Sequence, residues 1–180
     1  MPPIPLATAD KIAAKIAAEL IPFCDQVEIA GSIRRRRPQV NDIDIVALPK
    51  SPAAEAAMRE RCTRNAVRLQ TDGKQTLIAY YPLRGLSSEA LFELDLWIAE
   101  PDRRDLFSHT PTNFGTLLLC RTGSKQHNIY LIEHAKRLGL RWNPYHGVYD
   151  GAGHCLACVT EHEIFQALRL EFVPPEAREV

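Results

Sequence analysis

The sequence lacks an excess of charge of one sign, a large number of cysteines and any long hydrophobic run. Its 22 lysines and arginines balance its 22 aspartates and glutamates, so no overall basic field attracts nucleic acid and any such attraction must be local. Five cysteines in 180 residues are sparse and odd in number, which favours reduced thiols over a disulfide scaffold. No apolar run approaches the roughly 18 residues of a membrane-spanning helix, so we expect no membrane partner.

The amino-terminal segment, residues 1–10, is rich in proline and lacks the charged and then apolar pattern of a secretion signal. Secretion is therefore not expected. The reduced cysteines point to a cytoplasmic protein, with a nucleoid association or a viral origin also open.

The hydrophobic periodicity alternates between helix and strand patterns along the chain. Helices are predicted at residues 10–20, 52–62, 112–119, 125–138 and 161–168, and strands at 27–30, 42–48, 67–69, 75–81 and 91–99, with a hairpin within 142–159. Pro174 and Pro175 are expected to end regular structure. We therefore expect an α/β (α+β) fold with a sheet unit over residues 1–105 and a smaller α+β unit over 106–180.

Three aspartates lie at strand positions that share a face. Asp42 and Asp44 are two residues apart, so their side chains point to the same side of a strand. Neighbouring carboxylates repel each other unless a cation lies between them, and their hard oxygen ligands suit Mg²⁺. If the strand that carries Asp95 lies beside the first, three carboxylates gather as two-metal nucleotidyl transfer requires. The plain alternative is that all three are solvent-facing strand residues.

The segment "GSIRRRR", Gly31 to Arg37, precedes the first two aspartates. A Gly-Ser turn at the end of a strand offers backbone N–H groups and a hydroxyl to phosphate oxygens. The guanidinium groups of Arg34 and Arg35 suit phosphate as well. Arg36 and Arg37 read as solvated loop residues.

Together, G-S-x-R-R, D-x-D and a third aspartate in "FELDLW" resemble the nucleotidyltransferase superfamily, and specifically the family X DNA polymerases. The later segments "RTGSKQHN", "LGLRWNPYHGVY" and "EIFQALRLEFVPPEARE" resemble the Thr-Gly segment, the closing hairpin and the carboxyl-terminal tail of bacterial members. The resemblance implies a palm with a mixed sheet and flanking helices over residues 1–105, and a thumb-like domain over 106–180. The family's lyase, helix-hairpin-helix and phosphoesterase regions have no counterpart, as in the small palm-plus-thumb viral members.

The resemblance also implies roles for individual residues. Asp42, Asp44 and Asp95 would be catalytic and bind Mg²⁺, with Mn²⁺ as a second candidate. The nucleoside triphosphate would be bound by Gly31, Ser32, Arg34, Arg35, Cys120, Arg121, Thr122, Gly123, Lys125 and Asn128. Because Cys120 and Arg121 replace the family's tyrosine and phenylalanine, a strict preference for deoxynucleotides does not follow. Ile132 likewise replaces an arginine that contacts the template base in relatives.

The favoured function is a minimal family X DNA polymerase that adds nucleotides to a primer 3′-hydroxyl, in gap filling or repair, with release of pyrophosphate. Because the net charge is zero, DNA binding is expected to be weak and salt-sensitive, and a protein partner would supply further grip. The local cations are Arg34 to Arg37, Lys125, Lys136, Arg137 and Arg141.

Two other functions stay open. The first is nucleotide transfer to a non-DNA acceptor such as an RNA end, a protein or a small molecule. The second is a catalytically idle, nucleic-acid-binding accessory subunit. A metal site at His154, Cys155, Cys158 and His162 also stays open, with buried thiols and surface histidines as the favoured alternative.

Overall fold

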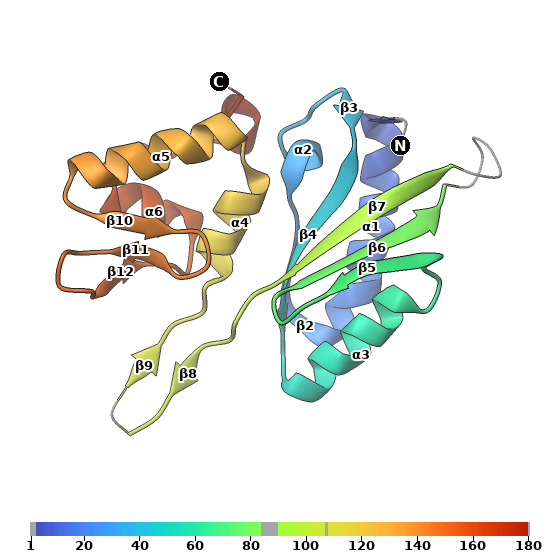
Figure 1. The fold of residues 1–180 in the computed structure, drawn as a ribbon, viewed down its shortest axis with the longest axis horizontal. Coiled ribbons are helices and arrows are strands. Elements are labelled where there is room, and N and C mark those ends of the chain that lie inside the picture. Colours follow the sequence, from blue (N-terminus) through green and yellow to red (C-terminus); the bar gives the residue numbers. More distant parts are fainter. Residues whose placement is uncertain (1–2, 84–89, 107, 180) are drawn as a thin grey trace. The chain divides into compact units, whose positions relative to one another are not determined.

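The computed structural model describes residues 3–83, 90–106 and 108–179. The chain divides into two compact units, Met1–Ile98 and Ala99–Val180 (Figure 1). The first unit ends at Ile98, where its last strand ends. Among the described residues, no helix has both the length and the apolar character needed to cross a membrane.

The first unit is built on a five-stranded mixed sheet with the strand order β2-β4-β7-β6-β5. Its strands are β2 (Cys24–Ile29), β4 (Asp42–Pro49), β5 (Arg68–Asp72), β6 (Thr76–Pro82) and β7 (Leu91–Ile98). The central pair, β4 and β7, is parallel, while the other neighbours are antiparallel. A two-stranded pairing of β1 (Ile4–Pro5) with β3 (Gln39–Val40) lies outside this sheet.

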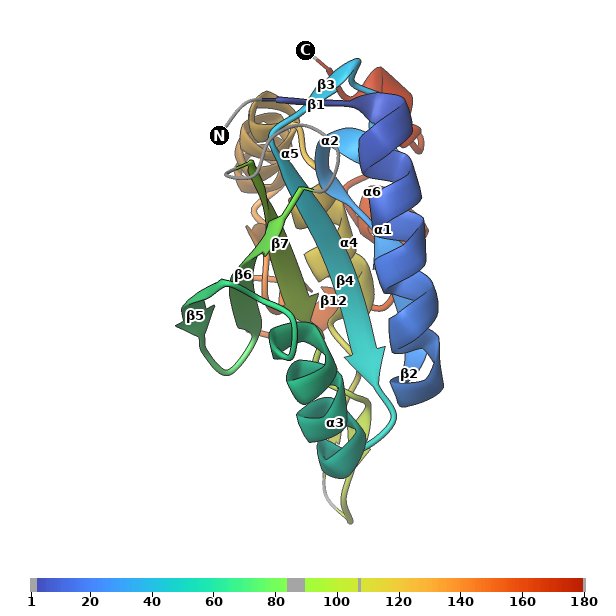
Figure 2. The same ribbon diagram turned by 90° about the vertical axis from the view of Figure 1, so that its right-hand side faces the viewer.

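One face of this sheet is covered by α1 (Leu6–Leu20) and α3 (Pro52–Thr63), as Figure 2 shows. The core between them forms because β4 and β7 alternate apolar and polar residues, so that one set of side chains faces the helices. Members of this core include Ile43, Ile45, Leu94, Leu96, Ala13 and Met58. The opposite face of β4 and β7 is polar and carries the acidic residues.

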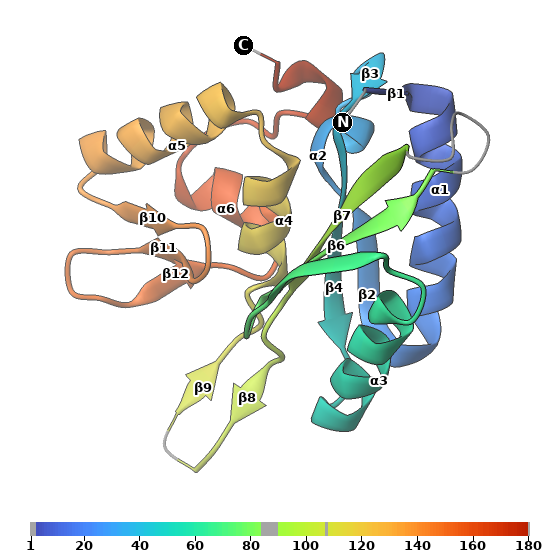
Figure 3. The ribbon, with the colours of Figure 1, turned by 45° about the vertical axis from the view of Figure 1, so that its right-hand side comes forward.

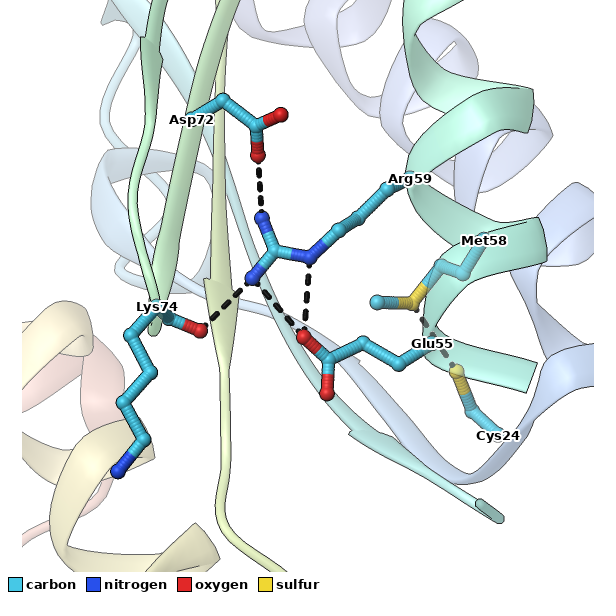
Figure 4. Close-up of polar contacts among 6 residues, drawn as sticks. All are labelled: Cys24, Glu55, Met58, Arg59, Asp72 and Lys74. Atoms are coloured by element: carbon cyan, nitrogen blue, oxygen red, sulfur yellow. Dashed lines mark hydrogen bonds and ion pairs between the residues drawn. The ribbon is translucent and has the colours of Figure 1, made fainter. Parts of the chain in front are cut away.

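Helix α3 is held at both of its ends by polar contacts. Ser51 caps its start, since its hydroxyl accepts a hydrogen bond from the Ala54 N–H at 3.1 Å. Near its other end Arg59 donates to Asp72 Oδ1 at 2.6 Å and to the Lys74 carbonyl at 2.7 Å (Figure 4). These contacts tie α3 to the turn between β5 and β6, and so fix the helix on the sheet.

The segment predicted as a Gly-Ser turn forms one turn of helix, α2 (Gly31–Arg34). The Arg34 and Arg35 amides donate to the Ala30 and Gly31 carbonyls, because Gly31 adopts a positive φ of 58° that lets the chain turn sharply out of β2. The carboxyl-terminal prolines also differ from expectation, since Pro175–Ala177 forms a short 3₁₀ helix.

The second unit packs α4 (Phe114–Thr122), α5 (Lys125–Arg137) and α6 (Glu161–Ala167) with a three-stranded antiparallel sheet. The strands of that sheet are β10 (Arg141–Asn143), β11 (Gly147–Tyr149) and β12 (Cys155–Ala157), so the predicted hairpin gains a third strand. A separate ribbon, β8 (Arg103–Arg104) and β9 (His109–Thr110), precedes α4. The core gathers Leu119, Leu131, Ala135, Trp142, Val148, Ile164, Phe165 and Leu168.

A buried ion pair stabilises this unit near its carboxyl end. Arg178 is fully buried, and its guanidinium donates to Glu161 Oε1 at 2.6 Å and to the Val173 carbonyl at 2.8 Å. His127 of α5 is buried beside the pair, and burial together with the Arg178 charge lowers the pKa of the imidazole to about 4. The tail is thereby fastened to α5 and α6 around one charged pair.

We expect Arg178→Met to lower the free energy of unfolding of the second unit by about 3–5 kcal/mol, because Glu161 stays buried without its guanidinium partner. Urea unfolding measured by Trp142 emission, in a Trp97→Phe background, tests this value. The double variant Glu161→Gln/Arg178→Met should recover most of the loss. As a control, Arg137→Met at an exposed position should change the free energy of unfolding by less than about 0.5 kcal/mol. An equal loss of stability in Arg178→Met and Arg137→Met would contradict the role of the Arg178–Glu161 pair.

Candidate nucleotidyltransferase site

The pairing of β4 with β7 brings the predicted aspartates together. The two strands are in parallel register, with Asp44 level with Asp95 and Asp42 level with Glu93, and Figure 3 shows them side by side. Residues level with each other on neighbouring strands share a face. The expectation that the third aspartate lies on the strand beside the first two is confirmed at the level of the backbone.

The Gly31 turn lies directly against Asp44. A Cβ atom added at Gly31 would lie 2.0 Å from Asp44 Oδ2, so only glycine leaves room for the carboxylate there. The Ala30 N–H also donates to the Asp44 carbonyl at 2.9 Å. The backbone segment predicted to cradle phosphates is therefore in contact with one of the predicted metal ligands.

The carboxylates raise one another's pKa values because they are half-buried like charges. Burial, followed by the charges of Asp44, Glu93 and Asp42, raises the pKa of Asp95 to about 8. The pKa of Asp42 is raised by burial and by Glu93, and the charge of Arg35 opposes this shift. The site thus concentrates negative charge that a divalent cation would neutralise.

The Asp44 carboxylate is hydrogen-bonded to a side chain of β7. Its Oδ1 accepts from Trp97 Nε1 at 3.0 Å. Within residues 3–83, 90–106 and 108–179, no three His, Cys, Asp or Glu side chains are arranged to hold a metal ion, and this includes the three aspartates. The predicted convergence of the three side chains on a metal ion is thus not met as they lie among the described residues.

The donor set nevertheless fits a hard divalent ion. Asp95 Oδ1 is buried and has no hydrogen-bond partner, and a buried polar atom without a partner is costly unless something else binds it. Asp42, Asp44 and Asp95 offer carboxylate oxygens, which Mg²⁺ prefers as ligands.

The remaining predicted phosphate ligands lie in α2 and directly after it. Ser32 is half-buried, and its hydroxyl is buried without a hydrogen-bond partner. Arg34 and Arg35 are half-buried, while Arg36 and Arg37 are exposed. Arg36 lies 4.0 Å from the Asp10 carboxylate. Arg34 and Arg35 are thus the less exposed pair of the four arginines.

The predicted nucleotide ligands of the second unit lie where α4 meets α5. The Asn128 side chain donates to the Cys120 carbonyl at 2.8 Å, and its Oδ1 is buried without a partner. Arg121 donates to the Tyr145 hydroxyl at 2.7 Å. These three predicted residues therefore have protein contacts that hold the junction together.

The turn between the two helices is tightly built. Thr122 is fully buried, Gly123 has a φ of 73°, and the Gly123–Ser124 peptide bond is cis. Ser124 caps α5 by accepting a hydrogen bond from the His127 N–H, and Lys125 is exposed.

The histidines and cysteines around β12 have separate surroundings. His154 pairs with Asp150 at 3.1 Å, and the His162 ring stacks on Phe172 with centroids 3.9 Å apart. Cys155 is exposed, whereas Cys158 is buried, and burial raises its pKa to about 12. In the part of the chain that the structure describes, these four side chains do not form a metal site.

Comparisons with known proteins agree with this geometry. The family model described as DNA polymerase beta thumb matches residues 117–179. The DNA polymerase/3'-5' exonuclease PolX of Bacillus subtilis (strain 168) is 29% identical over 178 residues, which cover 97% of this chain and 28% of that protein. The crystal structure of Leishmania infantum polymerase beta in a ternary P/T complex matches with a TM-score of 0.77 at 17% identity, covering 99% of this chain and 77% of that one. The chain is thus similar to PolX in sequence and to polymerase beta in fold.

This chain thus has a polymerase beta-like fold and spans less than a third of the length of the Bacillus PolX. The mixed sheet and the helices that were predicted agree with that fold. The family model matches in the second unit, over a region that begins within α4 and includes the α4–α5 junction.

Three residues of this polymerase-like chain that contact the site were not predicted to do so. Trp97 and Glu93 flank Asp95 at two residues on either side, so strand periodicity already places them on its face. The Tyr145 hydroxyl accepts a hydrogen bond from Arg121. No periodic pattern in the sequence indicated this contact, because Tyr145 lies in a loop between β10 and β11.

We expect Asp95→Asn to become progressively more stabilising as pH rises. A carboxyl group with a folded pKa of about 8 and an unfolded pKa of 3.8 stabilises the native state least above pH 8, because the unfolded chain releases that proton far more easily. Between pH 5 and pH 8.5 in EDTA, the advantage of the variant over the wild type should grow by roughly 1–3 kcal/mol after allowance for solvent screening. Urea unfolding followed by far-UV circular dichroism measures the difference.

The exposed Asp25→Asn is the matched control for that experiment, since Asp25 lies on β2 of the same sheet. Its effect should not depend on pH over this interval. A pH-independent effect of Asp95→Asn as well would contradict the raised pKa of Asp95.

Proposed function

We propose that the chain is a metal-dependent nucleotidyltransferase that adds nucleotides to a DNA primer 3′-hydroxyl, as a minimal family X DNA polymerase. The observation that carries the proposal is the parallel register of Asp44 with Asp95, with the Gly31 backbone pressed against Asp44. Acid pairs of this kind beside a phosphate-binding turn serve phosphoryl and nucleotidyl transfer. The similarity to PolX and to polymerase beta supports this function.

In this proposal Asp42, Asp44 and Asp95 hold divalent ions, Mg²⁺ or Mn²⁺. The bound ions would lower the pKa of the primer hydroxyl and neutralise charge on the triphosphate. Asp95, which is level with Asp44, would accept the proton of the attacking hydroxyl.

The triphosphate would lie along α2. The α2 segment offers backbone N–H groups, the Ser32 hydroxyl and the guanidinium groups of Arg34 and Arg35. In the second unit, the α4–α5 junction at Cys120, Thr122, Gly123 and Asn128 would contact the sugar and base. Arg121 would act there through Tyr145, since its guanidinium already binds that hydroxyl.

We further propose that residues 1–105 act as the palm and residues 106–180 as the thumb. The grip on DNA is expected to be weak, because the chain has no net charge. Lys125, Lys136, Arg137 and Arg141 are exposed and available for phosphate contacts, and a protein partner would add to them.

The test is to incubate the protein with Mg²⁺ or Mn²⁺, a one-nucleotide-gapped duplex, and each dNTP and rNTP in turn. We expect single additions that are directed by the template base and that decline steeply between about 50 and 200 mM salt. Asp95→Asn should lower the rate by about a hundredfold or more, while Asp25→Asn should leave it unchanged. Because Cys120 and Arg121 border the proposed sugar pocket, the ratio of dNTP to rNTP use is measured in the same assay.

Two results would overturn the proposal. Labelling of RNA ends or protein acceptors without extension of the gapped primer would favour a transferase with a non-DNA acceptor. Binding of nucleic acid with no nucleotide transfer to any acceptor, in a folded protein, would favour an accessory subunit.

A further inference from the structure

The two-stranded ribbon of β8 and β9 lies outside both hydrophobic cores. Of its described residues, none belongs to either core. Figures 1 and 3 show the ribbon extending away from α4, the helix that follows it. Residues 101–106 and 108–110 are all exposed. The side chains of the ribbon are therefore available to bind another molecule.

The base of the ribbon is fixed on the second unit by hydrogen bonds. The Glu100 N–H donates to Asn113 Oδ1 at 2.7 Å, and the Thr112 hydroxyl donates to the Glu100 carbonyl at 2.7 Å. The Asn113 amide donates in turn to the Tyr145 carbonyl at 2.8 Å. Thr112 and Asn113 are buried. The ribbon therefore has a defined direction relative to the unit that carries it.

The ribbon carries one arginine on each of its faces. Arg103 and Arg104 are successive residues of β8, so their side chains point to opposite faces. Arg103 is level with Thr110 on β9. Arg104 is level with His109. Because guanidinium groups bind phosphate oxygens well, the ribbon can present a cation to the phosphates on either side of a groove.

The two aspartates of the ribbon have partners within it. Asp102 Oδ2 lies 2.8 Å from His109 Nε2, and its Oδ1 lies 3.7 Å from Arg104 Nε. Both oxygens of Asp105 accept hydrogen bonds from Ser108, one from the N–H and one from the hydroxyl, each at 2.7 Å. Because a guanidinium has five donors, Arg104 can bind a phosphate while its Nε stays beside Asp102.

The turn of the ribbon carries an exposed leucine. Leu106 is 94% exposed, and the next residue, 107, lies outside the described part of the chain. One side of the ribbon has a hollow of about 390 Å³ that is lined by Arg104, Asp105, Ser108 and His109. The major groove of DNA admits a two-stranded ribbon, and apolar side chains contact thymine methyl groups there. The ribbon thus has the dimensions and the side chains of a groove-binding element.

We propose that the β8–β9 ribbon is an arm that binds duplex DNA, with Arg103 and Arg104 on backbone phosphates and Leu106 in the groove. The inference rests on the proposed function, because it names the element by which the transferase holds its DNA. Charge complementarity favours DNA over a protein partner, since β8 and β9 present arginine, histidine and threonine rather than an apolar face. The chain has no net charge, so a few well-placed cations supply much of its phosphate binding.

The test is the affinity for a fluorescein-labelled, gapped DNA duplex, measured by fluorescence anisotropy without metal or nucleotide between about 50 and 200 mM KCl. We expect Arg103→Gln/Arg104→Gln to raise the Kd by about tenfold to fiftyfold, and to lower the slope of log affinity against log salt by about 2. Leu106→Ser should raise the Kd by about threefold to tenfold with the slope unchanged, because it removes an apolar contact and no charge.

The matched control is Lys11→Gln/Lys15→Gln, which removes two exposed cations of α1 in the first unit. It changes the net charge by the same amount as the arginine double variant. Its Kd should change by less than about twofold, since charges outside the interface are screened by salt. All the substituted positions are exposed, so each variant should fold, and far-UV circular dichroism checks this.

A second measurement uses the wild-type protein. Trypsin cleaves after exposed arginines, and mass spectrometry identifies each bond that is cut. With duplex at about ten times its Kd, cleavage after Arg103 and Arg104 should slow by about tenfold, because only the unbound fraction is cut. Cleavage after the exposed Arg64, at the end of α3, should stay unchanged.

Equal duplex affinity of the arginine and lysine double variants, or unchanged cleavage after Arg103 and Arg104 with DNA bound, would overturn the arm. An equal loss of affinity for single-stranded DNA would overturn the claim that the arm binds a groove. If the wild type extends primers normally in these cases, the proposed function stands and only this inference fails. If the arm binds duplex but the wild type transfers no nucleotide to any acceptor, the proposed function fails and the arm stands.

Discussion

The parallel pairing of β4 with β7 is the constraint on which the candidate site depends. It places Asp44 level with Asp95 while the alternate residues of both strands build the core against α1 and α3. A shift of the register by one residue would turn the acids into the core and the isoleucines and leucines outward. Burial of the apolar face therefore fixes the position of the acidic face, and the site needs no separate scaffold.

The second unit rests on a different kind of contact. Its tail is fastened by the buried Arg178–Glu161 pair, and the Ser124 N–H donates to the Arg178 carbonyl at 3.4 Å. The start of α5 and the Gly123 turn are thus tied to the carboxyl end of the chain. A buried charge pair tolerates little change of geometry, so it keeps this junction in place.

Much of the fold could be predicted from the sequence, because apolar periodicity and the Ser51 cap are local signals. The strand pairing of Asp95 with Asp44 was expected only on the condition that two distant strands were neighbours, which periodicity alone cannot decide. The one-turn helix at Gly31 and the third strand, β12, were missed, since each depends on tertiary contacts. The hydrogen bond from Trp97 to Asp44 could not be predicted either, because it depends on the pairing of two strands that are distant in the sequence.

The most direct measurement is a crystal structure of the protein with Mn²⁺ and a non-hydrolysable deoxynucleoside triphosphate, with the metal located by anomalous scattering. The account predicts Mn²⁺ at about 2.1 Å from carboxylate oxygens of both Asp44 and Asp95, with the triphosphate on the amides of the Gly31–Arg34 turn. Mn²⁺ bound elsewhere, or a triphosphate that does not touch that turn, would contradict the claim that these strands carry a nucleotidyltransferase site.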